Sequence, residues 1–174
     1  YGVAKAFGHY ACVNYREAYK MHISCAIMFN HESPRRGEEF VTRKITKGVA
    51  EFKKTGKKIC LGNLNASRDW GHAREYMYGA WLMLQQPTPD DYIFATGETH
   101  TVKQWLERAC EVAGVDFWDC YEQNPTMERQ SEVDYLKGDY SKVKKVLGWE
   151  PKIGFNELVE EMVKADEALL NNAG

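Results

Sequence analysis

The sequence has no long apolar run and no strong excess of charge of either sign. Its longest apolar stretches, such as "SCAIMF" at 24–29, are far shorter than the roughly 20 residues that a membrane-spanning helix needs. The formal net charge is −2, so no overall electrostatic field attracts the chain to nucleic acid or to an anionic lipid surface. We therefore expect neither a membrane nor a nucleic acid as a partner.

Paired cysteines and grouped metal ligands are also missing. The five cysteines are scattered, odd in number and contain no C-x-x-C motif, and the five histidines show no ligand spacing. This pattern predicts reduced thiols, a cytoplasmic location and no metal site.

What is present is an alternation of short apolar segments with longer segments of helical periodicity. Hydrophobic residues make up 44% of the 174 residues, enough for a real core. The pattern predicts strands over 22–29, 57–62, 92–96 and 116–121, and helices over 1–20, 40–53, 72–86, 99–114, 141–148 and 155–170. Such alternation is typical of an α/β fold with buried parallel strands, here followed by a mainly helical end. So few strands leave an open sheet edge, which we expect another segment to cover.

The first five residues, "YGVAK", place Tyr1 and Lys5 four apart on a predicted helix. Residues at this spacing share one face, and an ammonium group beside a phenol favours the phenolate. A phenolate can remove a proton from a sugar hydroxyl. By spacing alone, a pair on a helix surface remains the alternative interpretation.

Polar clusters follow the predicted strands, where α/β folds bind ligands. The segment "NHESPRRG" places Asn30, His31, Arg35 and Arg36 in a predicted loop, and two adjacent arginines suit a phosphate group. Further candidates are Arg68 in "RDWGHARE" and the pair Arg129 and Glu132 in "RQSEVD". A solvated basic loop and a surface ion pair remain the alternatives.

Several segments resemble the C-terminal half of the GDP-mannose 4,6-dehydratases, a family within the extended short-chain dehydrogenases/reductases. The resemblance runs from Tyr1 to about Met162. It is carried by "YGVAK", "FNHESPRRGEEFVTRKI", "LGNLNASRDWGHAREY", "ATGETHTV", "SEVDYLKGD" and "LGWEPKIGFNELVEEMVKAD". The resemblance implies the C-terminal part of a Rossmann-like doubly wound parallel sheet with a smaller, mainly helical substrate-binding domain. Residues 1–174 would hold the end of the NADP-binding domain interleaved with that substrate domain.

The resemblance also implies a role for each matching residue. Tyr1 and Lys5 match the catalytic pair, which also contacts NADP. His31 and Arg36 match cofactor ligands, and Arg35 is assigned to the cofactor with them. The loop of Arg35 and Arg36 also reaches a neighbouring subunit in family tetramers. The residues matching the GDP-sugar pocket are Asn30, Lys44, Arg68, Arg129 and Glu132.

The implied reaction converts GDP-mannose to GDP-4-keto-6-deoxymannose by NADP-dependent internal redox and loss of water, a step of GDP-fucose biosynthesis. The glycine-rich dinucleotide fingerprint is absent from the sequence, and neither Glu17 nor Glu32 can be assigned as the base at C5. We therefore expect an N-terminal half in the same or a separate chain, an inactive isolated segment, and a homo-oligomer. A non-catalytic module for GDP-sugar binding or subunit interaction is the alternative.

Overall fold

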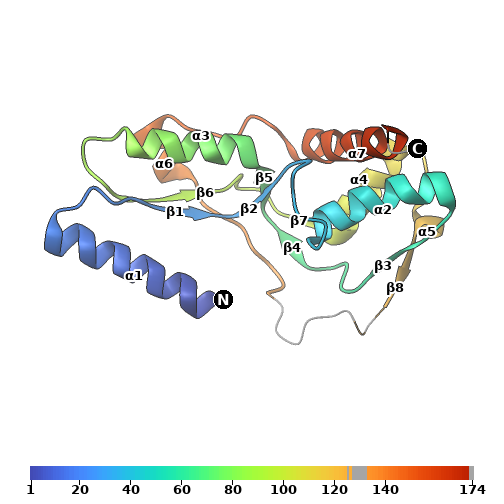
Figure 1. The fold of residues 1–174 in the computed structure, drawn as a ribbon, viewed down its shortest axis with the longest axis horizontal. Coiled ribbons are helices and arrows are strands. Elements are labelled where there is room, and N and C mark those ends of the chain that lie inside the picture. Colours follow the sequence, from blue (N-terminus) through green and yellow to red (C-terminus); the bar gives the residue numbers. More distant parts are fainter. Residues whose placement is uncertain (125, 127–132, 173–174) are drawn as a thin grey trace.

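The computed structural model describes residues 1–124, 126 and 133–172. Figure 1 shows its helices and strands in an elongated arrangement. The helices are α1 (Gly2–Tyr19), α2 (Val41–Thr55), α3 (Ala73–Leu84), α4 (Val102–Ala113), α5 (Phe117–Cys120), α6 (Ser141–Leu147) and α7 (Phe155–Asn172). The strands are β1 (Cys25–Met28), β2 (Asn30–Glu32), β3 (Ile59–Leu61), β4 (Ser67–Arg68), β5 (Trp70–His72), β6 (Asp91–Phe94), β7 (His100–Thr101) and β8 (Tyr121–Gln123).

The strand pairs are mainly parallel, as the sequence predicts. Strand β1 pairs with β6, β2 with β5, and β3 with β8, all in parallel register. The two-residue strands β4 and β7 pair antiparallel, with Arg68 opposite His100. Parallel strands need crossover connections, and here these connections contain helices α2, α3 and α4. The mixed α/β class is therefore confirmed.

Two hydrophobic cores hold the fold together, one in each half of Figure 1. The larger core packs α2, α4 and α7 against β3, with Trp105, Leu106 and Leu158 fully buried. The smaller core joins α3, α6 and β6 around Phe94 and Trp149. Strands β2 and β5 lie between these cores in Figure 1, so the residues around them are fixed from both sides.

Local sequence signals set the ends of α4. The Thr101 hydroxyl accepts a hydrogen bond from the Gln104 amide, and the Gln104 side chain accepts one from the Thr101 amide, which completes a capping box. The helix ends at Gly114, whose φ of 70° is the left-handed conformation that glycine adopts most easily. The predicted end at Gly114 is confirmed, whereas the helix begins at Val102 instead of residue 99 because His100 and Thr101 form β7.

The helix predicted at the start of the chain is confirmed, but its packing differs from that of the other long helices. No residue of α1 is buried, and Tyr1, Val3 and Phe7 are exposed. Strand β1 was expected to be buried on both faces, and this expectation is wrong because Ile27 is 44% exposed. Among the described strands β1 pairs with β6 alone, so its other edge has no neighbour there.

Two further sequence predictions need correction. Residues 116–121 were predicted as a strand, but Phe117–Cys120 forms a short helix because the Asp116 carboxylate accepts hydrogen bonds from the amides of Trp118 and Asp119. Strand β8 begins only at Tyr121. Asn30 and His31 were placed in a loop but lie on β2, where pairing with β5 extends the backbone. Among the described helices, none has the length and apolar character that crossing a bilayer requires.

Candidate functional site

One cavity of about 310 Å³ brings together four of the residues that the sequence singled out. Its wall carries Asn30, Arg36, Lys44 and Arg68. These side chains come from β2, the turn after it, α2 and β4, so only the folded chain assembles them. The apolar part of the wall includes Leu61, Ala66, Trp70 and Val102. The cavity therefore combines three cationic groups with an apolar wall.

Backbone pairing fixes the positions of these polar residues. Asn30 lies opposite Trp70 in the β2–β5 pair. Lys44 lies in the first turn of α2, where its amide donates to the Phe40 carbonyl at 2.8 Å. Arg68 ends β4, and its guanidinium donates to the carbonyls of Ser67 and Val133. The cations of the cavity are thus held by a strand end, a helix start and a tight turn.

Glu32 is a buried carboxylate in the same cavity, and it lies on β2 and not in the predicted loop. It accepts a hydrogen bond of 2.5 Å from the Thr42 hydroxyl, and one of its oxygens lies 3.3 Å from Arg36 Nε. Burial raises the pKa of Glu32 above its ordinary value, although the Thr42 hydrogen bond and the Arg36 charge both act to lower that pKa. Glu32 therefore positions Arg36 and partly offsets the positive charge of the cavity.

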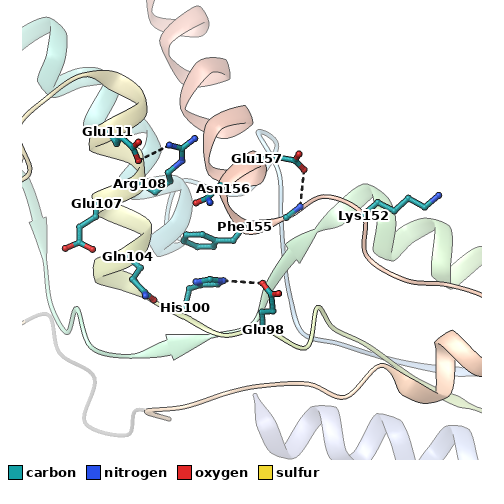
Figure 2. Close-up of a pocket in the computed structure, with 11 residues that line it drawn as sticks. Glu98, His100, Gln104, Glu107, Arg108, Glu111, Lys152, Phe155, Asn156 and Glu157 are labelled. Atoms are coloured by element: carbon teal, nitrogen blue, oxygen red, sulfur yellow. Dashed lines mark hydrogen bonds and ion pairs between the residues drawn. The ribbon is translucent and has the colours of Figure 1, made fainter.

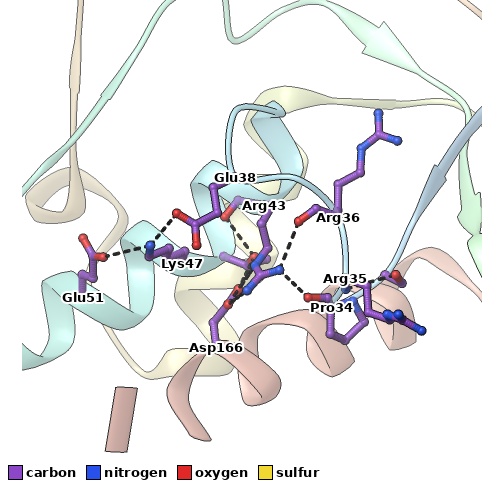
Figure 3. A network of polar contacts seen from close by, with 10 residues as sticks. Pro34, Arg35, Arg36, Glu38, Arg43, Lys47, Glu51 and Asp166 are labelled. Atoms are coloured by element: carbon purple, nitrogen blue, oxygen red, sulfur yellow. Dashed lines mark hydrogen bonds and ion pairs between the residues drawn. The ribbon is translucent and has the colours of Figure 1, made fainter. Parts of the chain in front are cut away.

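Arg36 is held from several sides, as Figure 3 shows in part. Its guanidinium carbon lies 3.6 Å from the centre of the Phe40 ring, a cation–π contact. Its carbonyl accepts a hydrogen bond of 3.1 Å from Arg43, which is paired with Asp166 of α7. Sequence reasoning missed Arg43, since Asp166 is 123 residues away and no local pattern indicates the pair.

Of the remaining predicted residues, those within the described part of the chain do not line this cavity. Lys5 Nζ lies 5.3 Å from the centre of the Tyr1 ring, so the two share one face of α1, but Tyr1 is 94% exposed. His31 Nδ1 lies 2.9 Å from the Phe29 carbonyl, and the His31 ring faces Tyr76. The Arg35 amide donates to the Ser33 hydroxyl in the turn after β2. Arg129 and Glu132 lie outside the described residues.

A larger hollow of about 740 Å³ lies between α4 and α7, beside β7 (Figure 2). None of the predicted site residues that the structure describes lines it. His100 stacks on Phe155 with 3.8 Å between ring centres. Arg108 is already paired with Glu111 and Glu160. The exposed glutamates of this larger hollow disfavour a phosphate-bearing ligand. The cationic cavity is therefore the stronger candidate, although its volume is smaller.

Three side chains of metal-binding type also lie together where α1 meets β1 and β6. The ligand atoms of His9, Cys25 and Asp91 are within 4.8 Å of one another. However, the Arg16 guanidinium donates to both oxygens of Asp91. Burial, with the Asp91 carboxylate as the next cause, raises the pKa of Cys25 to about 12, so the thiol keeps its proton at neutral pH. Because Arg16 already engages both oxygens of Asp91, this group is a poor metal site.

Comparisons with known proteins agree on one family. The family model described as GDP-mannose 4,6 dehydratase matches residues 1–162. GDP-mannose 4,6 dehydratase 1 of Arabidopsis thaliana is 49% identical over 181 residues, covering 100% of this chain and 50% of the relative. The Homo sapiens GDP-mannose 4,6 dehydratase is 43% identical, covering 98% of this chain and 50% of the relative. The chain thus spans about half the length of the curated relatives it matches, and it matches their C-terminal half.

Solved structures agree on the fold. RMD from Pseudomonas aeruginosa, complexed with NADPH, superposes with a TM-score of 0.85 at 18% identity, covering 97% of this chain and 56% of that one. The dTDP-glucose 4,6-dehydratase of Bacillus anthracis, in complex with NAD, gives a TM-score of 0.84 at 20% identity. The match covers 97% of this chain and 52% of that one. The chain therefore has about half of a Rossmann-like α/β fold shared with sugar-nucleotide enzymes.

Proposed function

The chain belongs to the GDP-mannose 4,6-dehydratase family, and we propose that it supplies the GDP-sugar pocket and the Tyr1–Lys5 catalytic pair of such an enzyme. The proposed reaction is a lyase step that converts GDP-mannose to GDP-4-keto-6-deoxymannose with loss of water, in GDP-fucose biosynthesis. The observation that carries this proposal is the convergence of Asn30, Arg36, Lys44 and Arg68 on one cavity.

The charges of the cavity suit a nucleoside diphosphate. Lys44 and Arg68 contribute positive charge to the cavity wall, where Glu32 is paired with the cofactor residue Arg36. Guanidinium groups bind phosphate oxygens with two parallel hydrogen bonds, and lysine adds a point charge. The apolar wall at Trp70 and Val102 offers a surface for a base or sugar ring. We assign Arg129 and Glu132 to the same ligand by resemblance.

NADP is the proposed cofactor, held by Tyr1, Lys5, His31, Arg35 and Arg36. The Arg36 guanidinium lines the cavity, and its Nε lies 3.3 Å from a Glu32 oxygen, which positions the group beside the cavity. The chemistry that a bound NADP supplies is removal of a hydride from C4 of the sugar and its return to C6. The Tyr1 phenolate takes the proton of the C4 hydroxyl, and the Lys5 ammonium stabilises that phenolate.

We propose that the chain works together with an N-terminal half bearing the glycine-rich fingerprint, as part of a cytoplasmic dimer or tetramer. In this arrangement residues 1–174 combine the end of the cofactor domain with the substrate domain. The proposal is supported by α1, which buries no residue, and by β1, one edge of which has no partner among the described strands. A helix with exposed Val3, Phe7 and Tyr10 needs a covering surface to be stable in water.

The first experiment measures GDP binding to the chain by calorimetry. We expect Arg68→Ala to weaken GDP binding by about 10- to 100-fold, since it removes charge-assisted hydrogen bonds worth about 1.5–3 kcal/mol. The matched control is Arg74→Ala, an exposed arginine on α3 outside the cavity. Equal GDP affinity in the Arg68 variant and the control would contradict the pocket assignment.

The second experiment tests catalysis with a complementary partner. The chain is co-expressed with the N-terminal half of the Arabidopsis relative, and 4-keto product is measured from GDP-mannose. We expect product from the combination and none from either half alone. GDP binding without product in the combination would instead indicate a non-catalytic binding module.

A further inference from the structure

A buried polar network ties the turn after β2 to helix α7 (Figure 3). Its centre is the pair Arg43 and Asp166, with side chains 8% and 2% exposed. Arg43 Nε lies 2.8 and 3.0 Å from the two oxygens of Asp166, and Nη2 lies 2.7 Å from Oδ1. The Thr46 hydroxyl donates to the other oxygen at 2.7 Å. The Asp166 carboxylate is therefore fully engaged inside the protein.

The other end of the Arg43 guanidinium holds main-chain atoms of the turn. Nη1 donates to the carbonyl oxygens of Pro34 and Arg36, which stand on either side of Arg35. The turn has other contacts as well: the Arg36 amide donates to the Ser33 carbonyl at 2.9 Å, and Glu38 pairs with Lys47 of α2 at 2.6 Å. Among these, the Arg43 guanidinium holds the main chain on both sides of Arg35 and links it to α7.

We propose that Arg43 is a positioning residue for the cofactor-binding turn, and that Asp166 of α7 in turn orients Arg43. This inference rests on the proposed function, in which Arg35 and Arg36 bind NADP. A guanidinium can satisfy a carboxylate and two carbonyls at once because its five donors lie in a fixed plane. The anchor therefore holds Arg36 ready at the cavity wall without itself touching a ligand.

The variant that separates anchoring from charge is Arg43→Lys. A lysine keeps the positive charge beside the buried Asp166, but its single ammonium cannot reproduce the fork that holds Pro34 and Arg36. We expect the thermal midpoint to shift little, while amide hydrogen exchange at residues 35–39 becomes about ten-fold faster. NADP binding should weaken by about ten-fold, because the binding-competent turn is then populated only a fraction of the time.

The matched control is Arg108→Lys. Arg108 also bridges to α7, through Glu160, but lies on α4 away from the turn. We expect it to leave both exchange at 35–39 and NADP binding unchanged. If Arg43→Lys does not fold, Asp166→Asn replaces it, since this variant leaves Arg43 in place but removes the charge that orients it.

The outcomes separate this inference from the proposed function. Unchanged exchange at residues 35–39 in the folded Arg43 or Asp166 variant overturns the anchoring role, whatever NADP does. Faster exchange with unchanged NADP affinity overturns the positioning role for the cofactor. If NADP does not bind the parent chain, the cofactor assignment fails for this chain, while the exchange measurement still decides whether Arg43 anchors the turn.

Discussion

Arg16 of α1 donates two hydrogen bonds to Asp91 at the start of β6, with Nη1–Oδ1 and Nη2–Oδ2 distances of 2.7 and 3.1 Å. Arg16 also donates to the Ile23 carbonyl at 3.1 Å, so it closes the connection between α1 and β1. Because α1 buries no residue, this pair is a principal tether between the helix that carries Tyr1 and Lys5 and the rest of the chain. The geometry of the proposed catalytic pair therefore depends on a polar contact.

Replacing Asp91 with asparagine should loosen this tether. The Arg16 hydrogen bonds, the largest cause, hold the pKa of Asp91 below its ordinary value of 3.8. A lowered carboxylate pKa contributes stability above pH 3.8 that is lost as the pH falls through the lower folded-state pKa. We expect Asp91→Asn to lower the free energy of unfolding by about 1 kcal/mol at neutral pH. The loss should become smaller as the pH falls below 3.8, because the parent then loses the Asp91 contribution as well. Urea unfolding at several pH values measures this.

The neighbouring Asp90 provides the control for that measurement. Its carboxylate lies 2.6 Å from Lys142 Nζ, but both side chains are about half exposed, so the pair contributes little. Asp90→Asn should change stability by less than Asp91→Asn. An equal effect of the two substitutions would show that the Arg16 contact is not special.

The sequence mostly predicted the features that depend on interactions between neighbouring residues, and it missed those that depend on distant ones. Helix α4 was predicted closely because Thr101, Gln104 and Gly114 are signals within one helix. The short helix at 117–120 was missed because its aromatic residues favour a strand, while the Asp116 cap decides for a helix. The exposure of α1 could not be read from its apolar periodicity, since periodicity predicts a face to bury and not the surface that covers it.

The candidate site shows the same limit. Asn30, Arg36, Lys44 and Arg68 were identified by resemblance, but that they share one cavity is a property of the β2, α2 and β4 packing. Glu32 was considered only as a base at C5, since its burial cannot be read from the sequence, and Arg43 was missed because its partner Asp166 is 123 residues away. Charged residues of this kind look like ordinary surface residues until the fold removes them from water.

The two glycines Gly8 and Gly79 lie within helices but should respond oppositely to alanine. A Cβ at Gly79 in α3 would meet the buried Phe94 ring at 2.2 Å, whereas a Cβ at Gly8 in α1 meets nothing within 4 Å. We expect Gly79→Ala to destabilise the protein by about 1–3 kcal/mol through overpacking. Gly8→Ala should stabilise it by at most about 1 kcal/mol, because alanine favours the helix. Thermal unfolding of both variants checks the contrast, and an equally tolerated Gly79→Ala would refute the close α3–β6 packing.

The buried Glu32 should give the stability a pH dependence of opposite sign to that of Asp91. Burial raises the pKa of Glu32 above 4.5, so the folded state keeps a proton that the unfolded state has lost. Stability therefore falls as the pH rises from 4.5 through the folded-state pKa. We expect the stability of Glu32→Gln relative to the parent to improve as the pH rises over this range, since the amide has no proton to lose.

Glu38 provides the opposite case for comparison. The Lys47 hydrogen bond lowers the pKa of this exposed carboxylate, so its contribution is lost as the pH falls. Denaturant unfolding of Glu38→Gln below about pH 4.5 and of Glu32→Gln above about pH 4.5 should give slopes of opposite sign relative to the parent. A Glu32 variant whose difference from the parent is the same at every pH would show that this carboxylate is not strained by burial.

Tyr1→Phe tests the proposed chemistry most directly. In the chain combined with the N-terminal half of the Arabidopsis relative, removing one phenolic oxygen removes the proposed proton acceptor, so we expect kcat to fall by about 10²- to 10⁴-fold. GDP affinity should stay unchanged, because Tyr1 does not line the cationic cavity. Tyr10→Phe, an exposed tyrosine on the same helix, is the matched control and should keep full activity. If the Tyr1 variant forms 4-keto product as fast as the Tyr10 variant, the proton acceptor lies elsewhere, and the lone role left to α1 is to bind its covering partner.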